Sequence, residues 1–177
     1  NKLIVGFDYT ITGHAYKCTN CPEDFNTPDI DNYTVTTLAG QTGVTGSNNG
    51  QGTDASFFQP DGLDVDSSGN IYIADIYNNL IRKIDPSGYV TTLAGQTGVR
   101  GSENGQATLA SFNYPRDVAV DSFSNVYVAD YMNHLIRKVD SNGNVTTFAG
   151  KDGVAGSSNG QGTSAEFSQP KSIAIDS

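Results

Sequence analysis

One tripeptide divides this chain at equal intervals and so limits the folds open to it. Leu38-Ala39-Gly40 returns as Leu93-Ala94-Gly95 and, with one substitution, as Phe148-Ala149-Gly150, a period of 55 residues. The residues between these points recur at the same period, for example Ile81-Arg82-Lys83 and Ile136-Arg137-Lys138. Self-similarity at a fixed period indicates a fold in which one supersecondary unit is repeated and stacked on its neighbours.

Within one unit, apolar residues alternate with small or polar ones, which indicates strands and not helices. Polar clusters such as Asp121-Ser122-Phe123-Ser124-Asn125 separate these runs and suit tight turns. In the second repeat the expected strands cover 117–120, 126–129, 135–139 and 145–148. Each unit is therefore predicted to be a four-stranded antiparallel meander. A Gly-rich connector leads to the next unit, in agreement with the 20 Gly residues of the chain.

Four strands per unit with long connectors predict the blades of a β-propeller. Asn133-His134-Leu135, flanked by Tyr127-Val128-Ala129-Asp130 and Ile136-Arg137-Lys138, resembles the core of the NHL repeat family. The first repeat reads Asn78-Asn79-Leu80 at this point, one residue away. The resemblance covers roughly residues 33–177 and implies an all-β, β-propeller-like fold. It implies no single activity, since NHL propellers serve as protein-binding, RNA-binding, sensor and enzyme scaffolds.

The period predicts three four-stranded antiparallel blades, one of them split between the N- and C-termini. Residues 38–92 and 93–147 are complete repeats, whereas 148–177 holds only a connector and a first strand, Ser172-Ile173-Ala174-Ile175-Asp176. Residues 1–37 are expected to complete that blade. Candidate second, third and fourth strands there are Leu3-Ile4-Val5, Ala15-Tyr16-Lys17 and Thr34-Val35-Thr36-Thr37, with a Cys-bearing insertion at about 18–31.

Unpaired strands at both ends would leave backbone groups and apolar side chains without partners. Three blades are fewer than the four to eight that close an ordinary propeller ring. We therefore predict that the chain associates with copies of itself by strand complementation, as a filament or a multi-chain ring. The expected assembly strands contain Leu3, Ile4, Val5, Ile173, Ala174 and Ile175. The alternative is that the chain is a fragment of a longer NHL protein.

Charge and composition exclude some partners and favour others. A net charge of -9 argues against nucleic-acid binding, and no apolar run is long enough to span a membrane. Asn32 and Asn144 begin glycosylation sequons, and Cys18 and Cys21 form a Cys-x-x-Cys pair that we expect to be a disulfide. Together these signs predict a secreted or cell-surface protein that carries glycans.

Two clusters imitate metal sites. Asp64 and Asp75 have a calcium-loop spacing, but the recurrence of Asp66 as Asp121 favours a role in hairpin turns. His14 near the two cysteines could contribute to a Cys2His site, for which one more ligand would be needed. No catalytic residue, metal ligand or cofactor is therefore assigned.

The remaining polar repeats have structural interpretations. Asp75 and Asn78 are expected to organise a loop by accepting backbone N–H bonds. Arg82-Lys83 and Arg137-Lys138 are interpreted as the solvated face of a strand. The function predicted from the sequence is thus a non-enzymatic extracellular structural module. The alternative is a ligand-binding or lyase/lactonase-like enzyme propeller.

Overall fold

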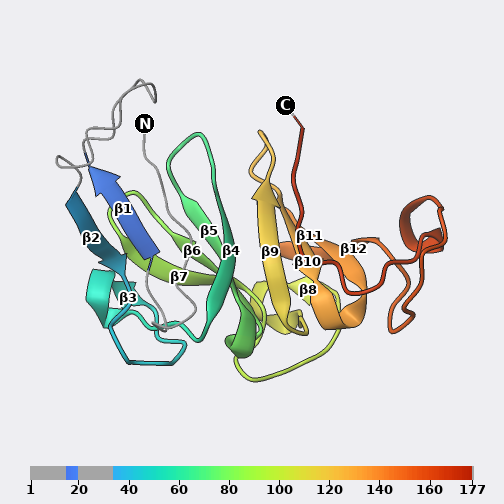
Figure 1. Cartoon of the computed structure of the whole chain (residues 1–177), viewed down its shortest axis with the longest axis horizontal. Helices are drawn as coiled ribbons and strands as arrows, with labels where there is room; N and C mark the ends of the chain where they lie inside the picture. The colour runs from blue at the N-terminus through green and yellow to red at the C-terminus, as the bar shows by residue number, and fades with distance from the viewer. Residues whose placement is uncertain (1–14, 20–33, 177) are drawn as a thin grey trace.

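The computed structural model describes residues 15–19 and 34–176, and it is an all-β protein. Two five-stranded antiparallel sheets lie side by side without closing into a ring (Figure 1). The described part of the chain contains short 3-10 helices but no α-helix, and none of its helices could cross a bilayer. The predicted all-β propeller architecture is confirmed.

The first sheet, named blade 1, has the strand order β3-β7-β6-β5-β4. Its strands are β3 (Gly50–Gln51), β4 (Pro60–Val65), β5 (Ile71–Asp75), β6 (Leu80–Ile84) and β7 (Tyr89–Ala94). The second sheet, blade 2, repeats this order as β8-β12-β11-β10-β9. Its strands are β8 (Gly105–Gln106), β9 (Pro115–Val120), β10 (Val126–Asp130), β11 (Leu135–Val139) and β12 (Asn144–Ala149).

Four strands of each blade fall where the alternating pattern predicts them, within two residues at each end. The fifth strand was not expected, because β3 and β8 are two-residue strands inside the Gly-rich connectors. Each connector also forms a 3-10 helix, η2 (Gly52–Asp54) or η4 (Ala107–Leu109), directly after its short strand. The connectors are thus structured parts of the blades and more than linkers.

The Gly of the recurring tripeptide has a steric reason. Gly95 ends β7 with φ +97°, and a Cβ there would lie 2.5 Å from the backbone oxygen of Asn79. A second 3-10 helix, η3 (Ile76–Asn78) or η5 (Tyr131–Asn133), joins the second and third strands of each blade. Only glycine permits this close approach between the strand end and the loop that follows η3.

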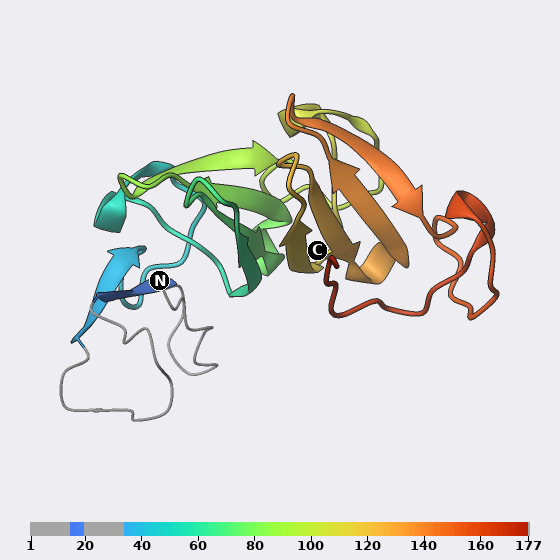
Figure 2. The ribbon, with the colours of Figure 1, turned by 90° about the horizontal axis from the view of Figure 1, so that it is seen from above.

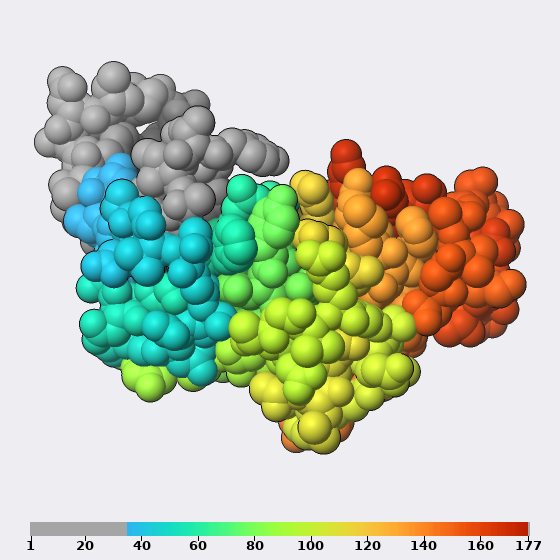
Figure 3. All heavy atoms as spheres, turned by 90° about the horizontal axis from the view of Figure 1, so that it is seen from below, coloured from blue at the N-terminus to red at the C-terminus, as the bar shows by residue number. Residues whose placement is uncertain are grey.

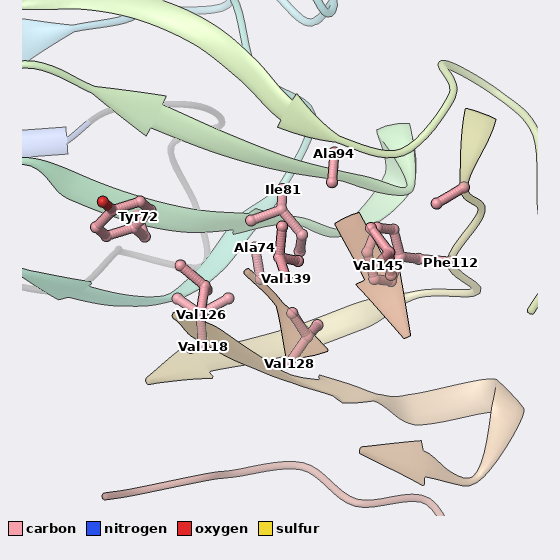
Figure 4. Close-up of a cluster of buried hydrophobic side chains, with 11 residues drawn as sticks. Tyr72, Ala74, Ile81, Ala94, Phe112, Val118, Val126, Val128, Val139 and Val145 are labelled. Carbon is pink, nitrogen blue, oxygen red and sulfur yellow. The ribbon is translucent and has the colours of Figure 1, made fainter. Parts of the chain in front are cut away.

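The core between the two blades is built from both of them (Figure 4). Blade 1 contributes Tyr72, Ala74, Ile81 and Ala94. Blade 2 contributes Ala110, Phe112, Val118, Val126, Val128, Val139 and Val145. The opposite face of blade 1 packs in a second cluster that includes Ala39 of β2 (Thr34–Ala39). The core residues are therefore buried mainly by the packing of neighbouring sheets on one another, and not by contacts between strands of the same sheet.

A two-stranded sheet of β1 (Ala15–Thr19) and β2 precedes blade 1 (Figure 2). Its register places Ala15 opposite Ala39 and Tyr16 opposite Thr37, with an irregularity between them. The third and fourth strands of both blades show the same register with the same irregularity. We call this pair the half-blade, because it reproduces strands three and four of a blade.

The chain after blade 2 repeats the connector but not the sheet. Residues 155 and 167 form the parallel bridge seen at 45 and 57 and at 100 and 112, and η6 (Gly162–Ser164) matches η2 and η4. The segment 170–176, which aligns with β4 and β9, has no ladder partner among the described residues. We call it the unpaired segment. The space-filling view shows the units following one another in sequence order across the molecule (Figure 3).

Candidate interaction surfaces

A buried arginine ties each connector to its blade. The Arg82 guanidinium is fully buried and donates to a carboxylate oxygen of Asp75 at 2.9 Å and to the Ser56 carbonyl at 3.0 Å. Its second terminal nitrogen donates to the Asn48 carbonyl and to Oδ1 of Asn49. The interpretation of this arginine as part of a solvated strand face is wrong, because the connector supplies acceptors that replace water.

Blade 2 repeats this arrangement, which we call the arginine clasp. Arg137 is also fully buried and donates to Asp130 at 3.1 Å and to the Ser111 carbonyl at 3.1 Å. Its outer nitrogen donates to the Glu103 carbonyl and to Oδ1 of Asn104. The two arginines were both assigned to the surface by sequence, and both belong to the core.

The carboxylates of the clasp are occupied by structural bonds. Oδ1 of Asp75 accepts the Phe58 N–H, so its predicted loop-organising role is confirmed. The same prediction is wrong in detail for Asn78, whose amide donates to Oδ2 of Asp75 and to the Gly46 carbonyl and accepts no backbone N–H in these bonds. Burial raises the pKa of Asp75 to about 6, against the opposing effect of these bonds, and it raises the pKa of Asp130 to about 6 in the same way. Both carboxylates are completely buried.

The hairpin turns are organised by aspartates, as the sequence predicts. Asp66 accepts the N–H groups of Ser68 and Asn70, and Asp121 accepts those of Phe123 and Asn125. No three His, Cys, Asp or Glu side chains of the described chain gather as metal ligands.

Aspartates on the inner strands have a different role that sequence reasoning missed. Oδ2 of Asp64 in β4 accepts the N–H of Val120 in β9 at 2.7 Å. Oδ2 of Asp117 in β9 accepts the N–H of Ile173 in the unpaired segment at 3.0 Å. These carboxylates lie two positions apart in the repeat, so comparison of equivalent residues could not reveal their shared function.

The loops provide a second link at each junction. Oδ1 of Asn79 accepts the N–H of Tyr114 at 3.0 Å, and Nδ1 of His134 accepts the N–H of Gln169 at 3.0 Å. We call these contacts, with those of the inner-strand aspartates, the junction latches. The loop latch recurs at equivalent residues between blade 2 and the segment after it, and an inner-strand aspartate makes a similar contact there, two positions earlier in the repeat. The unpaired segment is therefore held in the place of the first strand of a third blade.

Aromatic side chains reinforce the junction between the two blades. Phe58 and Tyr77 of blade 1 stack at 5.0 Å, and Tyr77 meets the edge of Tyr114 at 5.4 Å. The Arg100 guanidinium lies 4.4 Å above the Tyr114 ring. These side chains pack against one another across the junction and so help to hold the two blades together.

Among the described residues, one face of blade 2 is only partly covered. Tyr72 of blade 1 is 3% exposed and Ile81 is fully buried, whereas their equivalents Tyr127 and Ile136 are only half-buried. Phe148, which lies against Tyr127 at 5.0 Å, is 54% exposed. We call the face formed by Tyr127, Ile136 and Phe148 the open face. It is apolar because its sequence is that of a face that a next blade would cover.

An apolar residue of the half-blade is exposed as well. Val35 in β2 is 69% exposed, although it holds the register position of Val90 and Val145. Val145 is buried in the core between the two blades, and Val90 is buried in the core on the opposite face of blade 1. Within the described part of the chain, the half-blade thus carries a second exposed apolar position.

Several predicted site residues cannot be placed by the structure. Leu3, Ile4, Val5, Asn32 and Cys21 lie outside the described residues. Cys18 belongs to β1, so its pairing with Cys21 stays a prediction. Ile173, Ala174 and Ile175 lie in the unpaired segment, and Asn144 is exposed at the start of β12, where its side chain donates to Asp140.

The comparisons with known proteins agree with the observed repeats. The family model described as NHL repeat matches residues 57–84 and 112–139. Protein SUPPRESSOR OF QUENCHING 1, chloroplastic, of Arabidopsis thaliana is 38% identical over 98 residues, which are 55% of this chain and 9% of that protein. A probable peptidyl-alpha-hydroxyglycine alpha-amidating lyase of Caenorhabditis elegans is 33% identical over 91 residues, 50% of this chain and 25% of that protein.

The fold itself is shared with a solved structure. A protein of unknown function from Bacteroides thetaiotaomicron aligns with a TM-score of 0.69 and 25% identity, over 92% of this chain and 37% of that one. The chain therefore spans well under half the length of these relatives. One of the two sequence relatives bears an enzyme name, so the match to the repeat does not decide whether this chain is an enzyme.

Proposed function

We propose that this chain, an NHL-repeat propeller protein, is a non-enzymatic structural and interaction module that joins to copies of itself by completing a split blade. The unpaired segment of one copy supplies the first strand of that blade, and residues 1–37 of another supply the remaining strands, with the insertion at about 18–31. Residues 38–92 and 93–147 are the two blades that each copy brings complete.

One observation carries this proposal: the two uncompleted parts of the molecule match different parts of the same blade. The half-blade has the register and the irregularity of strands three and four. The unpaired segment is held by junction latches in the place of strand one. A strand with free ladder groups is a template for a complementary strand, and each part supplies what the other requires.

The chemistry of the described residues supports a structural role. The buried carboxylates at Asp75 and Asp130 are engaged in the arginine clasps, and those at Asp66 and Asp121 in turns. We further propose that the module is secreted or cell-surface and glycosylated, since Asn144 lies exposed in a hairpin turn and begins a sequon.

Successive backbone N–H groups of a strand point to opposite sides within the sheet. This alternation identifies the residue of the unpaired segment whose N–H would bond to a complementary strand. The N–H groups of Val118 and Val120 bond to aspartate side chains, so the N–H of Ala119 between them faces β10. Ala174 is the equivalent of Ala119 in the unpaired segment. Its N–H therefore points to the side on which the second strand of a third blade would lie.

Sedimentation velocity over a range of concentrations, with negative-stain electron microscopy, measures the association directly. We expect the unmodified chain to form oligomers or filaments and Ala174→Pro to abolish them, because proline removes a ladder donor. Ala174→Ser keeps the N–H and should assemble like the unmodified chain. An unmodified chain that stays monomeric at every concentration would refute the proposal.

A further inference from the structure

We infer that the open face of blade 2 is the docking surface for the half-blade of a second copy, so that copies join head to tail with one defined pair of surfaces. The inference rests on the proposed function and names the side chains that would recognise the partner. Its occupant is a second copy of this chain, because the chain contains one complete example of the same contact.

The junction between blades 1 and 2 is that example. Val145 of blade 2 is 1% exposed because it packs in the same core as Tyr72 and Ile81 of blade 1, with Leu93 against that core. The contact joins the face of one blade to the fourth strand of the next. It is an interface of known composition that requires no further partner.

Each uncovered surface of the molecule is one side of that interface. The open face repeats the blade 1 side, with Tyr127 for Tyr72, Ile136 for Ile81 and Phe148 for Leu93. The half-blade repeats the blade 2 side, with Val35 at the register position of Val145. Docking of one onto the other would bury both patches in the arrangement that the chain already uses once.

The connector after blade 2 contains a second recognition element. In blades 1 and 2 an arginine is held by carbonyls of the connector, and the backbone bond that shapes this receptor recurs from Glu166 N–H to the Ser158 carbonyl. No described residue fills the arginine position of the third receptor. The residue at that register position in β1 is Tyr16.

The change from arginine to tyrosine is matched by a change in the receptor. Where the first two connectors have Ser56 and Ser111, the third has Glu166, whose carboxylate accepts the Ser158 hydroxyl at 2.9 Å. A tyrosine hydroxyl donates to a carboxylate, as Tyr72 does to Asp66 at 3.0 Å in blade 1. At these two register positions the split blade therefore has tyrosine and glutamate where the complete blades have arginine and serine, and the two residue types are chemically complementary.

Variants that each block one of the two surfaces test whether the open face binds the half-blade of a second copy. Val35→Asp blocks the half-blade side and Phe148→Asp blocks the open face. Both side chains are more than half exposed, so the folded monomer is expected to tolerate the changes. Phe123→Asp is the matched control, because Phe123 is 79% exposed in the turn between β9 and β10 and belongs to neither surface.

Sedimentation velocity and native mass spectrometry, with a mass tag on one variant, give the readout. Each blocked variant should associate with itself about 10- to 100-fold more weakly than the unmodified chain, and Phe123→Asp should associate normally. An equal mixture of the two blocked variants should form a 1:1 heterodimer and stop there, since each retains the surface that the other lacks.

The outcomes separate the two proposals. If the unmodified chain and both blocked variants assemble equally well, split-blade assembly holds and this pair of surfaces is wrong. If both variants are monomeric but their mixture gives no heterodimer, the contact is not head to tail and the inference is overturned. If the unmodified chain never assembles, the proposed function itself fails.

Discussion

Blades 1 and 2 have the same strands, turns and arginine clasp, yet one is covered on both faces and the other on one. Tyr72 and Tyr127 occupy equivalent positions, and only the first is buried, because blade 2 lies over blade 1 and no described strand ladder lies over blade 2. In this fold a residue becomes core through the neighbouring blade. Its own strand decides only which way it points.

The largest effect on stability is expected from the arginine clasp, which both blades contain. Arg82→Ala and Arg137→Ala should each lower the free energy of unfolding by about 3–5 kcal/mol, because each leaves a buried carboxylate without its partner. Urea denaturation measures this, and Lys83→Ala, at the half-buried position of β6, is the control. A loss below about 1 kcal/mol in both variants would show that the clasp is not a main tie between connector and blade.

A second pair of variants should destabilise the two blades to different extents. Ile81→Ala removes a fully buried side chain and should cost about 2–5 kcal/mol, whereas Ile136→Ala on the half-buried face should cost less than half as much in the monomer. Equal losses in a dilute, monomeric sample would contradict the difference in burial. Under assembling conditions the cost of Ile136→Ala should rise toward that of Ile81→Ala.

The loop latches offer a smaller contrast. Asn79→Ala removes a buried side chain, leaves the half-buried Tyr114 N–H without its acceptor and should cost about 1–3 kcal/mol. His134→Ala should cost less, because Gln169 is exposed and water can replace the imidazole. Hydrogen exchange at the Gln169 amide provides the local readout. His134→Asn, which restores the residue of blade 1, should keep that amide protected.

A turn residue should give a gain in stability. Ser124 has φ +62° at the position that Gly69 occupies in blade 1, and a left-handed conformation is unfavourable for residues with a Cβ. Ser124→Gly should stabilise the chain by about 0.5–1 kcal/mol, and Gly69→Ser should destabilise it by a similar amount. Thermal unfolding of the two variants would contradict this interpretation if both changes had the same sign.

The smallest expected difference concerns how the stability of the chain depends on pH. Burial opposes the ionised form of Asp66, but hydrogen bonds from Asn70, Tyr72 and Ser68 outweigh it and lower its pKa. Protons then bind the unfolded chain first, so stability present above about pH 4 is lost as the pH falls further. Asp66→Asn should flatten this acid limb more than Asp121→Asn, because Asp121 accepts hydrogen bonds from Phe123 and Asn125 but, in the described chain, from no tyrosine.

Unfolding midpoints between pH 3 and pH 7 measure the comparison. Asp75 and Asp130 act in the opposite sense, since their raised pKa values favour the folded chain as the pH falls from about 6 to about 4. Asp75 and Asp130 are present in both the Asp66→Asn and the Asp121→Asn variant, so their contribution is the same in each and does not affect the comparison. Identical acid limbs for the two variants would contradict the role given to the Tyr72 hydroxyl.

The strands could be predicted from sequence because each depends on local alternation and on the turn residues beside it. Blade strands such as β11, Leu135–Val139, begin and end where the apolar pattern does. The short strands β3 and β8 were missed because Gly-Gln carries no such pattern. They form only because the connector folds back onto the outermost long strand, and that is a tertiary effect.

The buried arginines were missed for a related reason. Arg82 beside Lys83 reads as surface charge, while its acceptors at Asn48 and Ser56 lie 34 and 26 residues earlier. A usable signal existed in the recurrence of an aspartate seven residues before the arginine in both repeats. The inner-strand latches gave no such signal, because Asp64 and Asp117 do not occupy equivalent positions.

The two-residue strands determine in which directions an assembly can grow. Each pairs with the outer strand of its blade, Gly50 with Val90 and Gly105 with Val145, and the chain then turns away into a 3-10 helix. The rim of every blade is thus capped by a ladder too short to nucleate another sheet. Growth by blade completion would lengthen a fibre of constant width, with no lateral fusion of fibres into bundles.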